Sequence, residues 1–600
     1  MTVGRRKVLL IGLCVFVVSL LIRLIGIGWG LPNDLHEQSY HPDEPVIFGY
    51  SQRVEPAKGK FTPGFYNYGT LYLTLLRVST DVASAYGAGP KDSSAKETWM
   101  AIGRFDLVGR VLSALAGAAT VWIVFLILLP RAGMLGSLFG AAALSFAPGH
   151  VVHSRFQTVD VLATFFLVVS LYFALRLLPS GDDPLPDDRL YLRLAVLSGV
   201  FAGLSAGTKY TGIFALVALL VVVVLDRRTA RWKALGLGVL AAVVVFFLAT
   251  PGALLDSHAF LRDFRYEMTH TQTGHGAVFA GTPSGFIFNV WNLFVAMGMV
   301  MVVGGIAGLV RATLKRHAWA VALLAFSLAY YILIGRAEVK FMRYVFPLLP
   351  ALAVGFGWLV SRAHIHPKAM VKAPLMFVCI LGLGGLFGGG LAMTVRVTQW
   401  MVEPDPRDET ALEIRNASSD STSVGLATDP WFYTPPFYPQ TAAGPWIESE
   451  PGSFERRYSW MQAATRPKVL RYVPADPRDR VDFDVRLLTE DKPDYVVLSS
   501  FEIGDYNRMK KLPSPPKGFE PQLGRAEEFM DTLRTEYDLV KVRGQQAAVP
   551  PSVFSGTVLP HDLAYIRPEV TVWKRKTDSQ SPSNGSSTTS GSTGAPAATR

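Results

Sequence analysis

Charge and cysteine are both scarce in this sequence, and each shortage excludes a class of protein. Only 18% of the 600 residues are charged, whereas soluble proteins carry about 25%. The two cysteines, Cys14 and Cys379, both lie within apolar runs, which excludes a disulfide framework. The net charge of +11 comes from short basic clusters between apolar runs, a pattern of membrane-protein loops rather than of nucleic-acid-binding surfaces. With a hydrophobic content of 50%, the sequence therefore predicts an integral membrane protein.

Apolar runs long enough to cross a bilayer follow one another from Val8 to Arg396. A membrane-spanning helix needs about 20 apolar residues. That rule predicts eleven spans, at residues 8–29, 106–129, 133–150, 158–178, 192–206, 209–225, 234–250, 286–310, 318–335, 342–361 and 373–395. The first is predicted to be a retained span rather than a signal peptide, because no small-residue cleavage site follows its long apolar stretch.

Basic residues in alternate short loops predict the orientation. Clusters at residues 227–233, 311–316 and 362–372 agree with the N-terminal Arg5-Arg6-Lys7 in a single alternating topology, in which all of them are cytoplasmic. We therefore predict a multi-pass protein of the inner (plasma) membrane with a cytoplasmic N-terminus and an extracytoplasmic C-terminal part. The segment 71–86 is too short and too charged for a twelfth span, and it is expected to form an interfacial helix.

This topology divides the chain into three parts. Residues 1–395 form the predicted transmembrane core, with large outer loops at 30–105 and 251–285. Residues 396–576 have the composition of a soluble domain, in which 408–415 suits a helix and 423–427 and 494–499 suit strands, so an extracytoplasmic α/β domain is expected. Residues 577–600 are rich in Ser, Thr, Gly and Pro and are predicted to be disordered.

The unusual polar residues all fall on the predicted outer side. They are Asp43, Glu44, Tyr66, Tyr68, Arg110, Arg155, Asp160, Lys209 and Arg343. An ionised residue within a span costs about 2.5–3.5 kcal/mol on insertion scales, so a partner or a charged ligand is expected near the membrane-embedded members. One shared outer site is the simplest prediction.

Carboxylates beside cations at a membrane surface suit the transfer of a sugar from a lipid phosphate. Lys or Arg is needed to hold the phosphate, which gains negative charge as the leaving group, and the acceptor hydroxyl needs a carboxylate to take its proton. Asp43 is the candidate base, with Glu44 beside it as a second catalytic candidate. The candidate phosphate ligands are Arg110, Lys209 and Arg343, and the candidate substrate-binding residues are Tyr66, Tyr68, Arg155 and Asp160.

These motifs resemble those of a known group of enzymes. The acidic pair Asp43-Glu44 is followed by the segments LVGRVLSA (107–114), HSR (153–155) with Asp160, GLSAGTKYTG (203–212) and RYVFPLLP (343–350). Over residues 8–395 the chain resembles bacterial members of the glycosyltransferase C (GT-C) superfamily, nearest family 39, that of protein O-mannosyltransferases and aminoarabinose lipid A transferases.

The resemblance implies a GT-C fold, a polyprenyl-phosphate sugar donor in the membrane, inversion at the anomeric carbon, and a catalytic base at the first outer acidic residue. The chain departs from the family pattern in two places. The segment Tyr66-Asn67-Tyr68-Gly69 lacks the Pro-Pro pair associated with close relatives. In the C-terminal part, Asp429-Pro430-Trp431 is not the Trp-Trp-Asp motif of oligosaccharyltransferases. The first departure leaves the acceptor open, whether protein, lipid or glycan, and the second argues against transfer of a whole glycan to asparagine.

Five of these residues also have a purely structural interpretation. Asp43 and Glu44 could simply begin a loop helix. Asp160 could pair with Arg155, Lys209 could extend to the interface, and Arg343 could anchor a helix end.

The sequence also bears on metal binding and on alternative functions. The spacing of His258, His270 and His275 fits no metal-ligand pattern, so no metal site is predicted, although a divalent metal is compatible with the chemistry. The alternative functions are a transporter or flippase of a lipid-linked or small substrate, and a non-catalytic envelope assembly protein.

Overall fold

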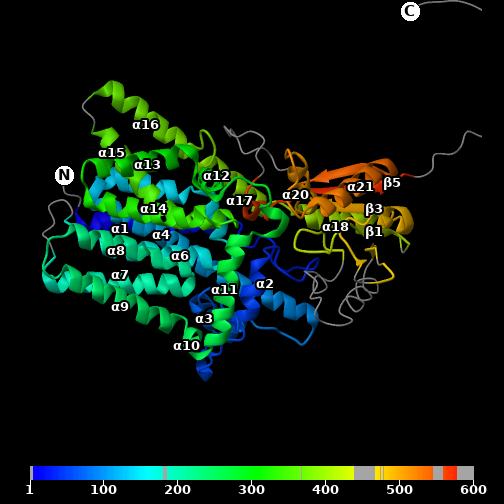
Figure 1. The fold of residues 1–600 in the computed structure, drawn as a ribbon, viewed down its shortest axis with the longest axis horizontal. Coiled ribbons are helices and arrows are strands. Elements are labelled where there is room, and N and C mark those ends of the chain that lie inside the picture. The colour runs from blue at the N-terminus through cyan, green and yellow to red at the C-terminus, as the bar shows by residue number, and fades with distance from the viewer. Residues whose placement is uncertain are drawn as a thin grey trace, which may run out of the picture.

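The computed structural model describes residues 4–179, 186–365, 368–419, 421–437, 467–472, 474–476, 479–544 and 559–576. A bundle of long helices makes up most of the molecule, and a smaller sheet domain lies at one end of it (Figure 1). The N-terminus lies at the opposite end of the bundle (Figure 1). A mainly helical protein with a C-terminal sheet domain agrees with the predicted fold class.

The bundle forms where the sequence has its apolar runs. Its helices are α1 (Arg5–Leu24), α4 (Ala95–Ser145), α6 (Val159–Leu175), α7 (Asp188–Thr208), α8 (Ala215–Leu225), α9 (Arg231–Ala249), α12 (Gly285–Met297), α13 (Met299–Leu314), α14 (Ala318–Gly335), α15 (Leu349–His364), α16 (Ala369–Gly384) and α17 (Gly390–Val402). Small residues let neighbours approach closely: a Cβ on Gly199 of α7 would lie 1.9 Å from the carbonyl oxygen of Gly238 in α9.

The predicted count of eleven spans is not confirmed. Among the described residues, 6 helices are long and apolar enough to cross a membrane, or up to 7 if the bent pair α12–α13 is one span. One predicted span (106–129) and most of the next (133–150) fall within the single element α4, which is interrupted by non-helical backbone at Gly133. Others form helices that are too short, such as the 17 residues of α6, or a pair bent by 110°, as in α12–α13. Breaks of this kind are tolerated where other protein segments satisfy the backbone polar groups.

Shorter elements gather at the end of the bundle that faces the sheet domain. They include α2 (Asp43–Ser51), α3 (Leu71–Ala83), α5 (Pro148–His153), α10 (Gly252–Leu255), α11 (Ser257–Thr273) and the 3₁₀ turns η3 (Tyr210–Phe214) and η5 (Met342–Leu348). In Figure 1, α2, α3, α10 and α11 lie together there. The predicted interfacial helix at 71–86 is α3, which buries Tyr72, Leu73 and Leu76 and ends at Ala83 before a turn of π-helix.

The C-terminal domain is a five-stranded mixed sheet with helices. The strands β1 (Ser423–Leu426), β2 (Lys468–Leu470), β3 (Tyr495–Ser499), β4 (Tyr537–Arg543) and β5 (Val570–Arg575) run in the order β2-β1-β3-β5-β4. β1 pairs parallel with β2 and β3, whereas β5 pairs antiparallel with β3 and β4. The predicted helix and strands correspond to α18 (Pro406–Ala417), β1 and β3.

The described C-terminal helices beyond α18 are α20 (Ser500–Lys510), α21 (Glu520–Glu536) and α22 (His561–Ala564). The predicted domain boundary after residue 395 falls inside α17, and the predicted disordered tail 577–600 lies outside the described residues.

Two buried contacts fasten this domain to the bundle. The Tyr40 hydroxyl donates a hydrogen bond to Asp408, and the Arg407 guanidinium lies 3.6 Å from the centre of the Tyr40 ring. The second contact is the segment 559–566, whose apolar side chains belong to the hydrophobic core of the bundle; they are Leu559, Leu563, Ala564, Tyr565 and Ile566. The domain is therefore built into the bundle rather than carried on a linker.

Candidate functional site

Arg343 is the centre of a cluster of charged side chains at the domain-facing end of the bundle. It lies in η5, and its side chain is only 7% exposed. Its guanidinium reaches three carboxylates: Nη2 is 3.3 Å from Asp43, Nη1 is 3.7 Å from Asp562, and Nε is 3.9 Å from Asp160. Segments far apart in the chain thus meet at one guanidinium.

Lys209 joins the same cluster through Asp160. The chain leaves the helical conformation at Lys209, where α7 ends, and the side chain turns back so that Nζ lies 2.5 Å from an Asp160 oxygen. The ammonium also lies 4.5 Å from the centre of the Tyr344 ring. Only 16% of the Lys209 side chain is exposed, so it does not extend freely to an interface.

The alternative pair of Asp160 with Arg155 does not form in the described structure. Arg155 is fully buried and donates instead to the carbonyl of Ile22 and the hydroxyl of Thr398. Arg155, a predicted substrate-binding residue, is thus part of the packing between segments rather than of the charged cluster.

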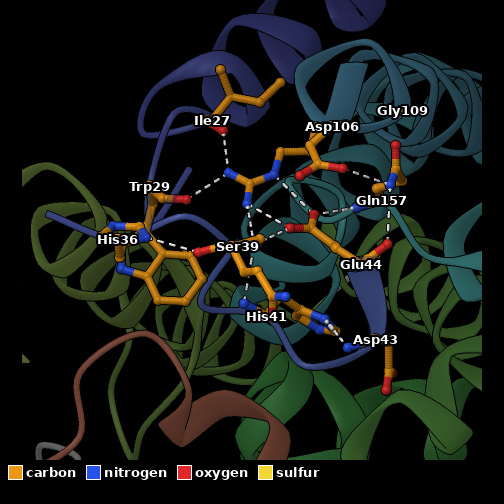
Figure 2. Close-up of polar contacts among 12 residues, drawn as sticks. Ile27, Trp29, His36, Ser39, His41, Asp43, Glu44, Asp106, Gly109 and Gln157 are labelled. Atoms are coloured by element: carbon orange, nitrogen blue, oxygen red, sulfur yellow. Dashed lines mark hydrogen bonds and ion pairs between the residues drawn. The ribbon is translucent and has the colours of Figure 1, made fainter. Parts of the chain in front are cut away.

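Asp43 and Glu44 are neighbours in sequence, but they face different surroundings. Helix α2 begins at Asp43, so both acids stand in its first turn, as the structural interpretation predicted. The Glu44 side chain is fully buried, whereas that of Asp43 is 33% exposed. Figure 2 shows Glu44 within a network of polar contacts and the Asp43 carboxylate pointing away from it. Asp43 is therefore the acid that a substrate can reach.

Glu44 and Arg110 form a buried ion pair that uses every donor of the guanidinium. Nε and Nη2 of Arg110 donate to the two carboxylate oxygens of Glu44 at 2.9 and 2.7 Å. Nη1 donates to the carbonyls of Ile27 and Trp29, and Nη2 also donates to the Ser39 hydroxyl. An arginine has five N–H donors. Because all five are used, the predicted phosphate-binding role of Arg110 is not supported by this geometry.

The same pair removes Glu44 from the candidate bases. Burial alone raises the pKa of Glu44, but the Arg110 guanidinium beside it holds the pKa of this carboxyl below its ordinary value. One of its oxygens also accepts the backbone N–H of Gln157 at 2.7 Å. A buried, fully hydrogen-bonded carboxylate of low basicity anchors the start of α2 and thereby places Asp43.

Breaking this pair is expected to destabilise the protein. Glu44→Gln leaves a buried guanidinium without its counter-ion, a change that costs about 3–5 kcal/mol in comparable cases. The thermal unfolding midpoint of the purified protein in detergent should fall clearly. Because Arg110→Met removes the orphaned charge, the double variant Glu44→Gln/Arg110→Met should recover part of the loss. An unchanged midpoint in Glu44→Gln would contradict the structural role.

The two tyrosines that were candidates for substrate binding lie in different surroundings. Tyr66 is buried, and its hydroxyl donates to Asp256 at 3.0 Å while its backbone N–H donates to Asp263, so it ties the first outer loop to the α10–α11 segment. Tyr68 is partly exposed and belongs to the site: burial, followed by the charge of Asp43, raises its pKa well above the ordinary value. Of the two, only Tyr68 remains a candidate for substrate contact.

Several residues of the site carried no signal in the sequence. Asp562 approaches Arg343 from the C-terminal domain, and Glu267 of α11 lies near Lys209 and Arg343, where burial raises its pKa. Neither belongs to a motif or to a predicted polar cluster. Their place depends on contacts that no local pattern encodes.

Two histidines of the segment after α10 lie side by side: His270 Nε2 and His275 Nδ1 are 3.3 Å apart. Across the part of the chain that the structure describes, no group of three or more His, Cys, Asp or Glu side chains is arranged to hold a metal ion.

The narrow cavity between the cations leaves little room. It is lined by Asp160, Lys209, Arg343, Thr211 and Tyr330, among others, and its volume is about 10 Å³. That is about the space of one water molecule. A phosphate held by both cations would therefore approach from the partly exposed side of the cluster, which is the side marked by Asp43.

Comparison with known protein families gives a match in the first half of the chain. Residues 97–253, about a quarter of the chain, match the family model described as dolichyl-phosphate-mannose-protein mannosyltransferase. This segment contains Arg110, Asp160 and Lys209 but neither Asp43 nor Arg343. No curated protein matches the sequence.

Solved structures show weaker likenesses. ArnT from Cupriavidus metallidurans in the apo state has 14% identity and a TM-score of 0.47, covering 93% of this chain and 97% of its own. The oligosaccharyltransferase of Archaeoglobus fulgidus in the apo form has 12% identity and a TM-score of 0.49, covering 88% and 73%. The protein O-mannosyltransferase Pmt1-Pmt2 complex of S. cerevisiae, bound to the sugar donor, has 21% identity and a TM-score of 0.30, covering 47% and 36%. Over residues 97–253 the chain is therefore similar to a family of glycosyltransferases, in agreement with the resemblance found in its motifs.

Proposed function

We propose that the protein is an inverting glycosyltransferase that moves a single sugar from a polyprenyl phosphate to an acceptor on the outer side of the plasma membrane. The observation that carries the proposal is the meeting of one partly exposed carboxylate, Asp43, with the cations Arg343 and Lys209. The matched family supports the donor class, since its description names a lipid-phosphate-linked sugar.

Each residue has a distinct part in the proposed reaction. Asp43 accepts the proton of the acceptor hydroxyl, whose oxygen attacks the anomeric carbon as the bond from that carbon to the phosphate oxygen breaks. The pair of electrons leaves with the polyprenyl phosphate, and the charge that gathers there is stabilised by Arg343 and Lys209. A single displacement of this kind needs one carboxylate base and inverts the configuration.

The two cations have donors available for a phosphate. Arg343 Nη1 is buried and has no hydrogen-bond partner among the described residues, in contrast to the saturated Arg110. Lys209 donates one hydrogen bond, to Asp160, whereas an ammonium carries three donors. Unused donors on buried cations favour an anionic ligand.

Lys209→Met is expected to weaken binding of undecaprenyl phosphate by about tenfold or more, because a charge-assisted hydrogen bond contributes about 1.5–3 kcal/mol. Binding to the full-length protein in detergent is measured by titration. The matched control is Lys340→Met: Lys340 is also buried, but its ammonium binds Glu338 and Thr282. Equal losses in both variants would contradict a specific phosphate site at Lys209.

Transfer itself is tested with membranes that contain the full-length protein. Labelled polyprenyl-phosphate sugars are supplied, and the lipid, glycan and protein fractions are each examined for label. Transfer to one fraction supports the proposal and names the acceptor class. Uptake of a labelled substrate into vesicles without any lipid-linked sugar would instead support the transporter, and failure to bind polyprenyl phosphate would support the assembly protein.

A further inference from the structure

We propose that Asp562 of the C-terminal domain is a positioning residue that holds Arg343 in place for the donor phosphate. The inference rests on the proposed function, and it makes the soluble domain a part of the site. Asp562 is fully buried, whereas Asp43 is 33% exposed, so Asp562 acts through Arg343 rather than on a substrate.

The Asp562 carboxylate holds the backbone that carries Arg343. One of its oxygens accepts the N–H of Met342 and the other accepts the N–H of Arg343, both at 3.0 Å. These are the first N–H groups of η5, which have no partner within the turn itself. Because both oxygens are used, the carboxylate fixes the start of this turn and with it the direction in which the Arg343 side chain leaves the backbone.

The same carboxylate also compensates the charge of Arg343. It lies 3.7 Å from Arg343 Nη1 and 3.5 Å from His153 Nε2. Burial lowers the pKa of His153 to about 4, although Asp562 opposes this shift, so the imidazole is neutral at pH 7. Arg343 is therefore the cation that balances Asp562 near neutral pH.

The segment around Asp562 is held firmly from both sides. Leu559, Leu563 and Tyr565 are buried in the hydrophobic core of the bundle, and the chain then enters β5 of the sheet. The segment that carries Asp562 is therefore packed against the bundle on one side and continues into the sheet on the other. The site is incomplete without the C-terminal domain.

The test measures binding of undecaprenyl phosphate to the full-length protein in detergent. Asp562→Asn keeps the size of the side chain but replaces one acceptor by a donor, which opposes a backbone N–H. The Kd is expected to rise about tenfold to hundredfold. The matched control is Asp484→Asn, since Asp484 is a buried carboxylate of the same domain that accepts a backbone N–H but pairs with Arg486. A Kd of Asp562→Asn no higher than that of Asp484→Asn would overturn the proposal.

A double-mutant cycle separates positioning from a general loss of stability. Asp562→Asn is combined with Arg343→Lys, and the effects on the Kd are compared. If Asp562 acts through Arg343, the Kd of the double variant is lower than the value obtained by multiplying the effects of the two single substitutions. Strictly multiplicative effects would overturn the positioning role while leaving the proposed function intact. Absence of binding in the unaltered protein would overturn both.

A second variant, which retains the charge, keeps the proposal testable if the first one misfolds. If Asp562→Asn does not fold, Asp562→Glu is used, which keeps the carboxylate but moves it by one methylene group. A raised Kd with an unchanged thermal unfolding midpoint supports the proposal. An unchanged Kd overturns it, because the two backbone bonds cannot both keep their geometry in that variant.

Discussion

Asp43→Asn should lower the rate of sugar transfer by about 10²–10⁴-fold, the usual contribution of a general base. The amide cannot take the acceptor proton, yet its shape is unchanged. Arg343 keeps its contacts with Asp160 and Asp562, so the protein should remain folded. Transfer is measured with a labelled polyprenyl-phosphate sugar, and folding by the thermal unfolding midpoint in detergent.

Binding of the donor phosphate should survive this substitution. Asp43 lies 3.3 Å from Arg343 and therefore competes with a phosphate for the guanidinium, so undecaprenyl phosphate should bind Asp43→Asn at least as tightly as it binds the unaltered protein. The control is Asp81→Asn, which removes another carboxylate that is paired with an arginine, Arg77. Near-normal transfer in Asp43→Asn would remove this residue from the mechanism.

Arg343→Met is expected to damage both the fold and the site. The substitution leaves Asp43, Asp160 and Asp562 near one another without the cation that they share. Removing one partner from a buried ion cluster costs about 3–5 kcal/mol, so the unfolding midpoint in detergent should fall. Binding of undecaprenyl phosphate should be lost in the same variant, as measured by titration.

The variant Arg343→Lys separates the effect on stability from the effect on phosphate binding. A lysine restores the charge and should recover much of the stability, but it lacks the planar fork of donors, so phosphate binding should stay about tenfold weaker. Arg336→Met is the control, because Arg336 is exposed at the end of α14. Full recovery of binding in Arg343→Lys would show that the site needs only a positive charge there.

The helical part of the fold was largely predictable, but the number of spans was not. Apolar composition is local, so a run such as 234–250 predicts α9 (Arg231–Ala249) without knowledge of its neighbours. The length of a helix depends instead on where it bends. Gly133 interrupts α4, and α12 and α13 meet at 110°, which depends on how the segments pack.

The sequence by itself predicted that these polar groups gather at one place, because alternating apolar runs and basic loops put all of them on one predicted side of the membrane. The sequence could not distinguish the roles of adjacent residues or of residues of the same type. Glu44 is bound by Arg110, 66 residues away, and that contact alone leaves Asp43 as the reachable acid. Asp562 accepts a hydrogen bond from the backbone N–H of Arg343, 219 residues away in the sequence, and no sequence motif predicts this contact. The tertiary structure decided these roles, because burial and the number of donors still unused are properties of the whole packed chain.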